Sequence, residues 1–116
     1  MYLNVVKAKT WAVGAKRLKS GEVRRRVVVY SPELSEFLRL LYESGVRRAV
    51  AVVDVPGWGV AAVRCSVVKM SPPYSGYGLY PLLSDASGLQ FVKIVNLLKG
   101  NERRAVEVVV KAVEPL

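Results

Sequence analysis

The residues of this sequence whose types and spacing could do chemistry are basic and aromatic side chains near its amino terminus. Lysine and arginine neutralise the phosphates of a nucleic-acid backbone, and aromatic rings offer bases a surface on which to stack. Alternation along two expected strands, residues 2–13 and 22–30, gives each strand one face with such groups and one mostly apolar face. Arg25 falls on the apolar side, and the basic and aromatic face carries Lys7, Lys9, Trp11, Arg24, Arg26 and Tyr30.

The charge of the chain is concentrated in the same region. Its 116 residues include 18 Lys and Arg against 9 Asp and Glu, a net charge of +9. Residues 1–31 hold eight of the basic groups and one acidic group, a net +7, so residues 32–116 carry only +2. The connection between the two strands, residues 14–21, is itself basic through Lys16, Arg17 and Lys19. We therefore expect this hairpin to bind nucleic acid; the alternative is a solvated strand pair in which Trp11 covers the core.

A second hairpin, residues 46–55 and 60–69 around the turn Pro56–Gly59, carries weaker candidates. Trp58 lies in the turn, where it either contacts a partner or folds back on the sheet. If Val55 pairs with Val60, one face of the hairpin is lightly basic and built of small side chains, so that a flat ligand could approach it. A slip of one residue would exchange the faces. That face comprises Arg47, Ala49, Ala51, Ala62, Arg64 and Ser66.

The segment 71–88 is rich in Ser, Pro and Gly, which is typical of a loop, and its length suggests a functional role. It contains three tyrosines, Tyr74, Tyr77 and Tyr80. Ordinary loop packing accounts for any one of them, but we expect at least one to contact the ligand. Tyr74 and Tyr77 are the candidates.

Catalytic and metal-binding chemistry finds little support in the sequence. The chain has no His and a single Cys, which excludes a histidine base, an internal disulfide and the usual ligands of a structural zinc. No carboxylate pair has a recognisable catalytic spacing: Asp54 ends a strand, and Asp85 is a helix cap. Cys65 lies in a valine-rich strand, where it is better explained as a small buried hydrophobe than as a nucleophile. We expect no enzymatic activity, no metal and no cofactor.

Two helices and a last strand complete the expected secondary structure. Ser31 is placed to cap a helix that begins at Pro32, and Gly45 is placed to end it. The order β-β-α-β-β-α-β predicts a single α+β domain over residues 1–116, with two layers: an antiparallel sheet of about five strands and two helices packed on one face. The remaining elements are a helix from near Asp85 or Ser87 to Lys99, ended by Gly100, and a strand over 102–113.

The overall composition resembles the amino-acid usage of hyperthermophiles. The chain has 23 Val and many charged residues but only four Asn and Gln. Its start lacks the basic and apolar regions of a signal peptide. The longest uncharged run, Met70–Ser84, is interrupted by three Pro and two Gly. We therefore expect a cytoplasmic protein that does not associate with membranes.

The basic and aromatic strands, the two amphipathic helices and this composition together resemble the ThermoDBP-related single-stranded DNA-binding proteins of hyperthermophilic archaea. The resemblance covers most of the chain and implies a domain without an OB fold, in which bases lie in a cleft on apolar and aromatic groups between basic edges. It rests on architecture and composition, so it assigns no roles to individual residues. The zipper-like C-terminal extension of the founding member has no counterpart in Lys111–Leu116. The sequence therefore does not decide whether this protein forms a homodimer.

The function expected from the sequence is sequence-independent binding of single-stranded DNA. An RNA-binding or ribonucleoprotein subunit would use the same face, and only contacts to a 2′-hydroxyl would separate the two. A third alternative, of a different class, is a protein-interaction subunit that builds an oligomer through its second helix and an exposed strand edge.

Overall fold

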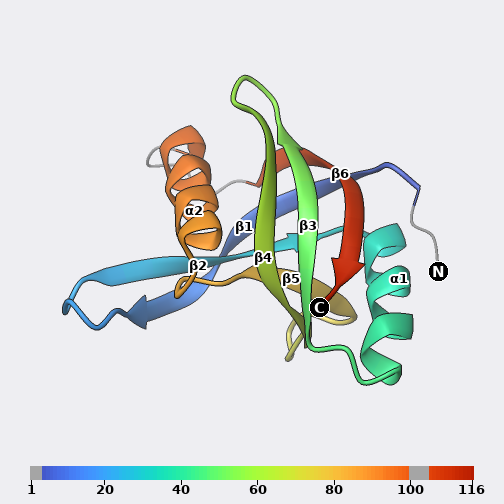
Figure 1. Cartoon of the computed structure of the whole chain (residues 1–116). Coiled ribbons are helices and arrows are strands. Elements are labelled where there is room, and N and C mark those ends of the chain that lie inside the picture. The colour runs from blue at the N-terminus through green and yellow to red at the C-terminus, as the bar shows by residue number, and fades with distance from the viewer. Residues whose placement is uncertain (1–3, 100–104) are drawn as a thin grey trace.

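A computed structural model describes residues 4–99 and 105–116, which contain six strands and two helices (Figure 1). The strands are β1 (Val6–Arg17), β2 (Val23–Tyr30), β3 (Arg48–Val55), β4 (Gly59–Lys69), β5 (Tyr77–Pro81) and β6 (Val106–Pro115), and the helices are α1 (Pro32–Glu43) and α2 (Ala86–Lys99). All strand pairs are antiparallel. Together they form a closed barrel in the order β1-β2-β5-β4-β3-β6.

The closed barrel shows that the predicted two-layer sheet is wrong. β6 pairs with both β1 and β3, and β5 pairs with both β2 and β4, so the sheet curls round until its ends meet. β5 lies inside the segment 71–88 that was predicted to be a loop, and it is the strand that makes closure achievable. One face of the sheet encloses the core, and closure pairs the edges that an open sheet would expose.

The helices lie on opposite sides of the barrel and contribute to one core (Figure 1). The predicted caps of α1 are confirmed, since Ser31 Oγ accepts a hydrogen bond from the Leu34 N–H at 3.0 Å and Gly45 follows the helix with a φ of +92°. Leu97 and Leu98, near the end of α2, are exposed. In the described ranges, neither helix is long and apolar enough to cross a membrane. The core residues that the helices supply are Leu34, Phe37, Leu38, Leu41, Phe91, Val92 and Val95.

The second helix begins at Ala86, between the two predicted starts. Its predicted end, Gly100, and the predicted start of the last strand at residue 102 lie outside the described residues.

The β3–β4 hairpin adopts a register one residue away from the predicted one. Val55 pairs with Gly59 instead of Val60, which exchanges the two faces of β3. The predicted ligand face of small side chains is therefore wrong, because its alanines on β3 turn into the barrel. The residues of this hairpin that line the core are Ala49, Ala51, Val53, Val55, Val63, Cys65 and Val67.

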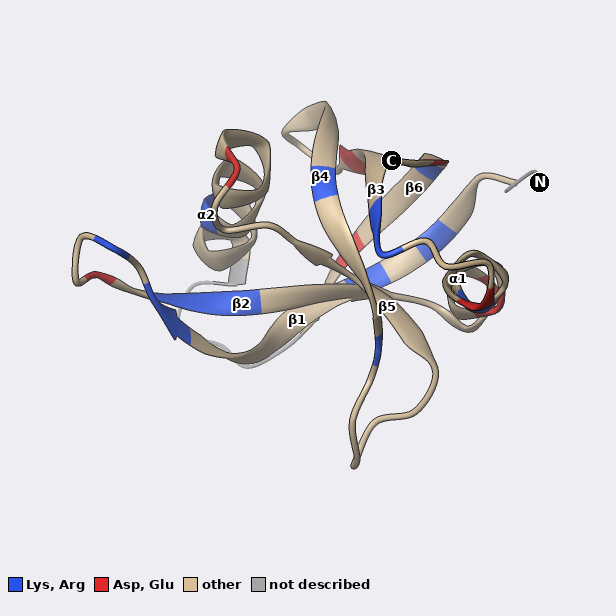
Figure 2. Cartoon of the chain, turned by 60° about the horizontal axis from the view of Figure 1, so that its bottom comes forward, with Lys and Arg blue, Asp and Glu red and all other residues tan. Residues whose placement is uncertain are grey.

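The β1–β2 hairpin extends beyond the barrel (Figures 1 and 2). β1 pairs with β6 only over Val6–Thr10, and β2 meets β5 only at the pair Val29–Leu79. Residues 14–26, called the ribbon from here on, therefore pair only with each other. The ribbon holds six basic residues and one acidic residue, a net charge of +5. A β-bulge between Ala12 and Gly14 separates the ribbon from the barrel part of β1.

Candidate nucleic-acid interface

An aromatic cluster lies on the outside of the barrel, at the base of the ribbon. The centroid of the Trp11 ring is 5.9 Å from that of Tyr30, edge to face at 73°, and 5.9 Å from that of Tyr74, tilted by 43°. Trp11 lies opposite Val28, and Lys9 lies opposite Tyr30, so these side chains share one face of the β1–β2 pair. Trp11 is half-buried and lies outside the core. The predicted outer face of β1 is thus confirmed as far as Trp11.

Tyr74 reaches the indole because its loop, Ser71–Gly76, is fixed at its base. We call this segment the tyrosine loop. The Tyr77 N–H donates a hydrogen bond to Ser35 Oγ of α1 at 2.9 Å. Gly76 has a φ of +92°, and a Cβ atom there would lie 2.5 Å from Ser35 Oγ, so the close approach of loop and helix requires glycine. The side chain of Tyr74, in contrast, is 45% exposed.

A small apolar layer outside the barrel supports the cluster. Val28 is fully buried but lies outside the main hydrophobic cluster of the barrel, and a Cβ atom at Gly78 would lie 2.5 Å from its Cγ2 and 3.4 Å from Met70 Sδ. Tyr80 borders this layer, with the Arg26 guanidinium 5.4 Å from the centroid of its ring. Partial burial raises the pKa of the Tyr80 hydroxyl, although the charge of Arg26 opposes the shift. The phenol therefore stays neutral at physiological pH.

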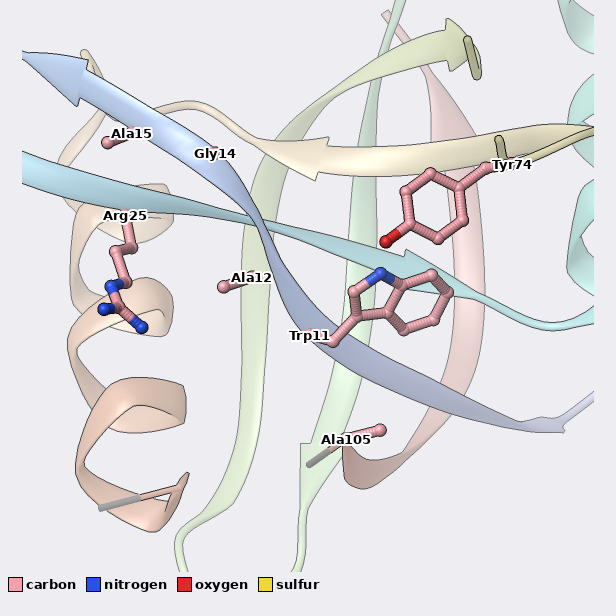
Figure 3. Close-up of a pocket in the computed structure, with 7 residues that line it drawn as sticks. All are labelled: Trp11, Ala12, Gly14, Ala15, Arg25, Tyr74 and Ala105. Atoms are coloured by element: carbon pink, nitrogen blue, oxygen red, sulfur yellow. The ribbon is translucent and has the colours of Figure 1, made fainter. Parts of the chain in front are cut away.

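Two open depressions meet at Trp11. The first has a volume of about 570 Å³ and extends toward the ribbon (Figure 3). The second has a volume of about 400 Å³ and follows the start of β1. The first is lined by Trp11, Ala12, Gly14, Ala15, Arg25, Tyr74 and Ala105. The second is lined by Lys7, Ala8, Lys9, Trp11, Tyr30, Ser31, Pro32 and Glu107.

This surface suits a ligand in which flat groups and negative charges alternate. The rings offer apolar faces for stacking, while Lys9 and Arg25 place a positive charge in each depression. Glu107 is the one acidic residue among the described residues that line them. Lys7 and Lys9 line the same depression as Glu107, so the second depression is still net positive.

The ribbon changes which arginine lines the depression beside the aromatic cluster. Arg24 was predicted on the face of Trp11 and Arg25 on the opposite face, but Arg25 lines the first depression. Arg24 is instead half-buried, forms an ion pair with Glu22 at 2.7 Å and faces α2. A bulge and the strong twist of a two-stranded ribbon rotate its side chains relative to the barrel, which breaks simple alternation. The depression at Arg24, of about 300 Å³, is also lined by Lys93, Asn96 and Leu97.

Four of the predicted site residues lie away from the cluster. Arg47 stacks on the Tyr42 ring at 3.6 Å and donates a hydrogen bond to the Tyr42 carbonyl at 2.8 Å, so it holds the end of α1. Tyr77 packs on the same ring, with centroids 5.2 Å apart. Arg64 forms an ion pair of 3.7 Å with a carboxylate at the start of α2. Trp58 is 51% exposed in the turn between β3 and β4.

The remaining predicted cations gather at the far end of the ribbon. Lys16, Arg17 and Lys19 line a third depression, of about 450 Å³, together with Leu83 and Ser84. The structure therefore separates the predicted basic residues of the hairpin: some lie near the aromatic cluster, three lie at the tip of the ribbon, and Arg24 faces α2. Figure 2 shows this concentration of basic residues, with one acidic segment at the turn.

Sequence reasoning missed two members of the surface, Arg25 and Tyr80. The sequence signal for Tyr80 is its alternation with Leu79 along β5, which the neighbouring Gly and Pro residues obscure. For Arg25 the sequence signal is Gly14, because a glycine within a strand often marks a β-bulge, and Gly14 has a φ of +153° at the bulge. The sequence does not show how such a bulge turns the neighbouring side chains, because that depends on the pairing of both strands.

The structure places Cys65 in the core, as the sequence predicted. Burial raises the pKa of its thiol to about 12, so the thiol is protonated at physiological pH. Because the thiolate is the reactive form, this cysteine is poorly suited to nucleophilic chemistry. Within residues 4–99 and 105–116, no group of three or more Cys, Asp or Glu side chains is arranged to hold a metal ion.

We expect the Cys65 thiol to resist a water-soluble aromatic disulfide reagent while the protein is folded, at about pH 8. In denaturant the same thiol should react fully, because unfolding restores an ordinary pKa and access to solvent. The measurement is the absorbance of the released thiolate with time. Rapid reaction of the native protein would contradict the buried position of the side chain.

The candidate interface consists of an aromatic cluster, the cations of two depressions beside it, and a basic ribbon. No family model matches the chain, and no curated protein or solved structure shows significant similarity to it.

Proposed function

We propose that this protein binds single-stranded nucleic acid, with DNA as the expected ligand and little dependence on base sequence. The observation that carries the proposal is the half-buried Trp11 where two open, positively charged depressions meet. Every base has a π-face, so stacking tolerates any sequence, and contacts to phosphates carry no sequence information. The resemblance to single-stranded DNA-binding proteins of hyperthermophilic archaea supports DNA over RNA.

In this proposal a strand follows β1 along its outer face. One base stacks on the indole of Trp11, and its neighbours lie against Tyr30 and Tyr74, whose rings already contact the indole. The phosphates on either side reach Lys9 in one depression and Arg25 in the other. Each base stacked on an aromatic side chain contributes about 1–3 kcal/mol.

A duplex fits this surface less well, because paired and stacked bases do not offer a free face. A groove could admit only an element that projects from the fold, which is the ribbon, and the aromatic cluster at its base would then have no free base face to stack on. The exposed side of α1 is acidic, and its Arg39 is held by Glu36 and Glu43. These carboxylates would repel phosphates that approached from that side.

A titration with single-stranded DNA, duplex DNA and RNA of one sequence tests the proposal. We expect single-stranded DNA to bind most tightly and its affinity to change little when the base order is scrambled. Tighter binding of RNA would make the protein a ribonucleoprotein subunit. Tighter binding of duplex would mean that the two-stranded ribbon enters a groove, which is wide enough for it. If none of the three binds, the protein-interaction alternative takes the place of this proposal.

The salt dependence of binding tests the role of the cations. With single strands, the logarithmic slope of affinity against salt is about −0.7 per neutralised phosphate, so four or five contacts give about −3. Changing both Lys9 and Arg25 to Gln should make the slope shallower by about 1.4. Arg48→Gln with Lys111→Gln is the matched control, since both residues are exposed and line none of the depressions described above. An equal change in the control, or a slope near zero in the unmodified protein, would contradict the assignment.

A further inference from the structure

The depression at the tip of the ribbon is chemically different from the two beside Trp11. It has a volume of about 450 Å³ and contains no aromatic side chain among the described residues that line it. Its lining combines three cations and two hydroxyl groups with two apolar side chains, Leu18 and Leu83. The cations are Lys16, Arg17 and Lys19, and the hydroxyls are those of Ser20 and Ser84.

The backbone holds this depression in place. The Leu18 N–H donates a hydrogen bond to the Glu22 carbonyl at 2.7 Å, and the Gly21 N–H donates one to the Leu18 carbonyl at 2.9 Å, which closes the turn of the ribbon. Gly21 has a φ of +86°, as this tight turn requires. Leu18 packs against the core, and Leu83, which lines the same depression, is buried. The tip is thus docked on the segment that leads into α2.

The charge of the depression is not cancelled by the carboxylates nearest to it in the sequence. Glu22 is paired with Arg24 at 2.7 Å. The Asp85 carboxylate accepts hydrogen bonds from the N–H and the hydroxyl of Ser87, and it forms the ion pair with Arg64. These hydrogen bonds and the charge of Arg64 lower the pKa of Asp85, so the carboxylate is ionised and its charge is satisfied by partners at the start of α2. Neither acid lines the depression.

We infer that the tip depression is a phosphate-binding subsite, which holds a backbone phosphate of the strand that stacks on Trp11. Three cations and two hydroxyl donors around an open hollow match the charge and hydrogen-bonding capacity of a phosphate group. The subsite rests on the proposed function, because Lys16 and Arg17 belong to the same strand, β1, as Trp11. Five residues of extended chain, about 16 Å, separate Trp11 from Lys16. A strand bound at the cluster must therefore continue for several nucleotides before it reaches the tip.

Oligonucleotide length separates the two parts of the surface. We would compare binding of about four and about twelve nucleotides of single-stranded DNA, which span the usual range of small single-strand sites. The test variant changes Lys16, Arg17 and Lys19 to Gln, and the matched control changes Arg39, Arg48 and Lys111 to Gln. We expect the test variant to bind the short oligonucleotide like the unmodified protein but to bind the long one at least tenfold more weakly. The control should retain the gain in affinity with length.

Several results would overturn the inference. Equal losses at both lengths, or the same loss in the control, would mean that the tip acts only through net charge. If the unmodified protein bound both lengths equally well, the subsite would fail while the proposed function stood. If it bound neither length, the proposed function itself would fail.

Inorganic pyrophosphate distinguishes a strand from a free phosphorylated ligand. We expect pyrophosphate to compete with the long oligonucleotide and to leave binding of the short one unchanged. If pyrophosphate bound tightly without displacing the long oligonucleotide, the depression would be a site for a free phosphorylated ligand. That result would overturn the inference.

Discussion

Replacing Gly88 with alanine is expected to lower the free energy of unfolding by about 3 kcal/mol, the upper end of the usual cost of overpacking. Gly88 lies in the first turn of α2, where the helix packs directly on the backbone of Leu82. A Cβ atom at this position would lie 2.0 Å from the Leu82 carbonyl oxygen and 2.7 Å from its nitrogen. The obstacle is main chain, so no rotamer change relieves it. The helix must move away from the barrel, and its buried residues Phe91, Val92 and Val95 must move with it.

Urea-induced unfolding of the variant and the unmodified protein measures this loss. The matched control is Gln90→Ala, an exposed position two residues further along the same helix. Alanine at Gln90 should change the stability by no more than about 0.5 kcal/mol, because helix propensity alone separates the two residues. Outside such a contact, Gly→Ala in a helix is worth a gain of about 0.5–1 kcal/mol. A stabilised Gly88→Ala variant would therefore mean that α2 does not approach Leu82 in this way.

The elements that could be predicted from the sequence are those whose signals are local. The helix α1 has its cap at Ser31, its first residue at Pro32 and its stop at Gly45, and the structure confirms all three. Its apolar residues recur at helical spacing and are buried. Capping and spacing depend only on residues a few positions apart, so one sequence is enough to detect them.

Barrel closure and strand register could not be predicted, because they depend on contacts between distant segments. β3 is apolar on both faces over most of its length, so alternation does not tell which face is inside. The structure buries Ala49 and Ala51, while Val50 and Val52 are only partly covered. β5 is five residues long and includes Gly78 and Pro81, and it is recognisable as a strand only through its partners.

In the candidate site, too, the features that depend on local sequence could be predicted, and those that depend on strand pairing could not. Burying an unpaired ammonium group is costly, so Lys7 and Lys9 had to face outward, and alternation then carried Trp11 with them. That reasoning holds until the bulge at Gly14, where one extra residue and a strong twist change the direction of the side chains. Arg25 therefore lines the depression that extends from Trp11, although alternation assigned it to the other face.

Replacing Trp11 with alanine is expected to weaken single-stranded DNA binding about fivefold to 150-fold, which corresponds to the 1–3 kcal/mol of one stacked base. Trp11 is the residue common to both depressions beside the cluster, so its loss removes the surface that connects them. Trp11→Phe should retain much of the affinity, because a flat ring remains. Fluorescence anisotropy of a labelled oligonucleotide measures each affinity. Quenching of Trp11 fluorescence by unlabelled DNA, in a Trp58→Phe background, reports contact at the indole directly.

The matched control for this prediction is Trp58→Ala, since Trp58 is exposed in the β3–β4 turn and lines none of the depressions around the ribbon. Trp11 contacts Tyr30 and Tyr74 outside the core, and such pairs are worth about 0.5–1.5 kcal/mol each. The Trp11→Ala variant should therefore remain folded, with a moderate decrease in its melting temperature, and its affinity should be measured well below that temperature. Trp11 would be a structural residue if Trp11→Ala lowered the stability strongly but left the DNA affinity unchanged, and if DNA did not quench Trp11 fluorescence in the Trp58→Phe protein. Base stacking would then have to rest on Tyr30, Tyr74 and Tyr80.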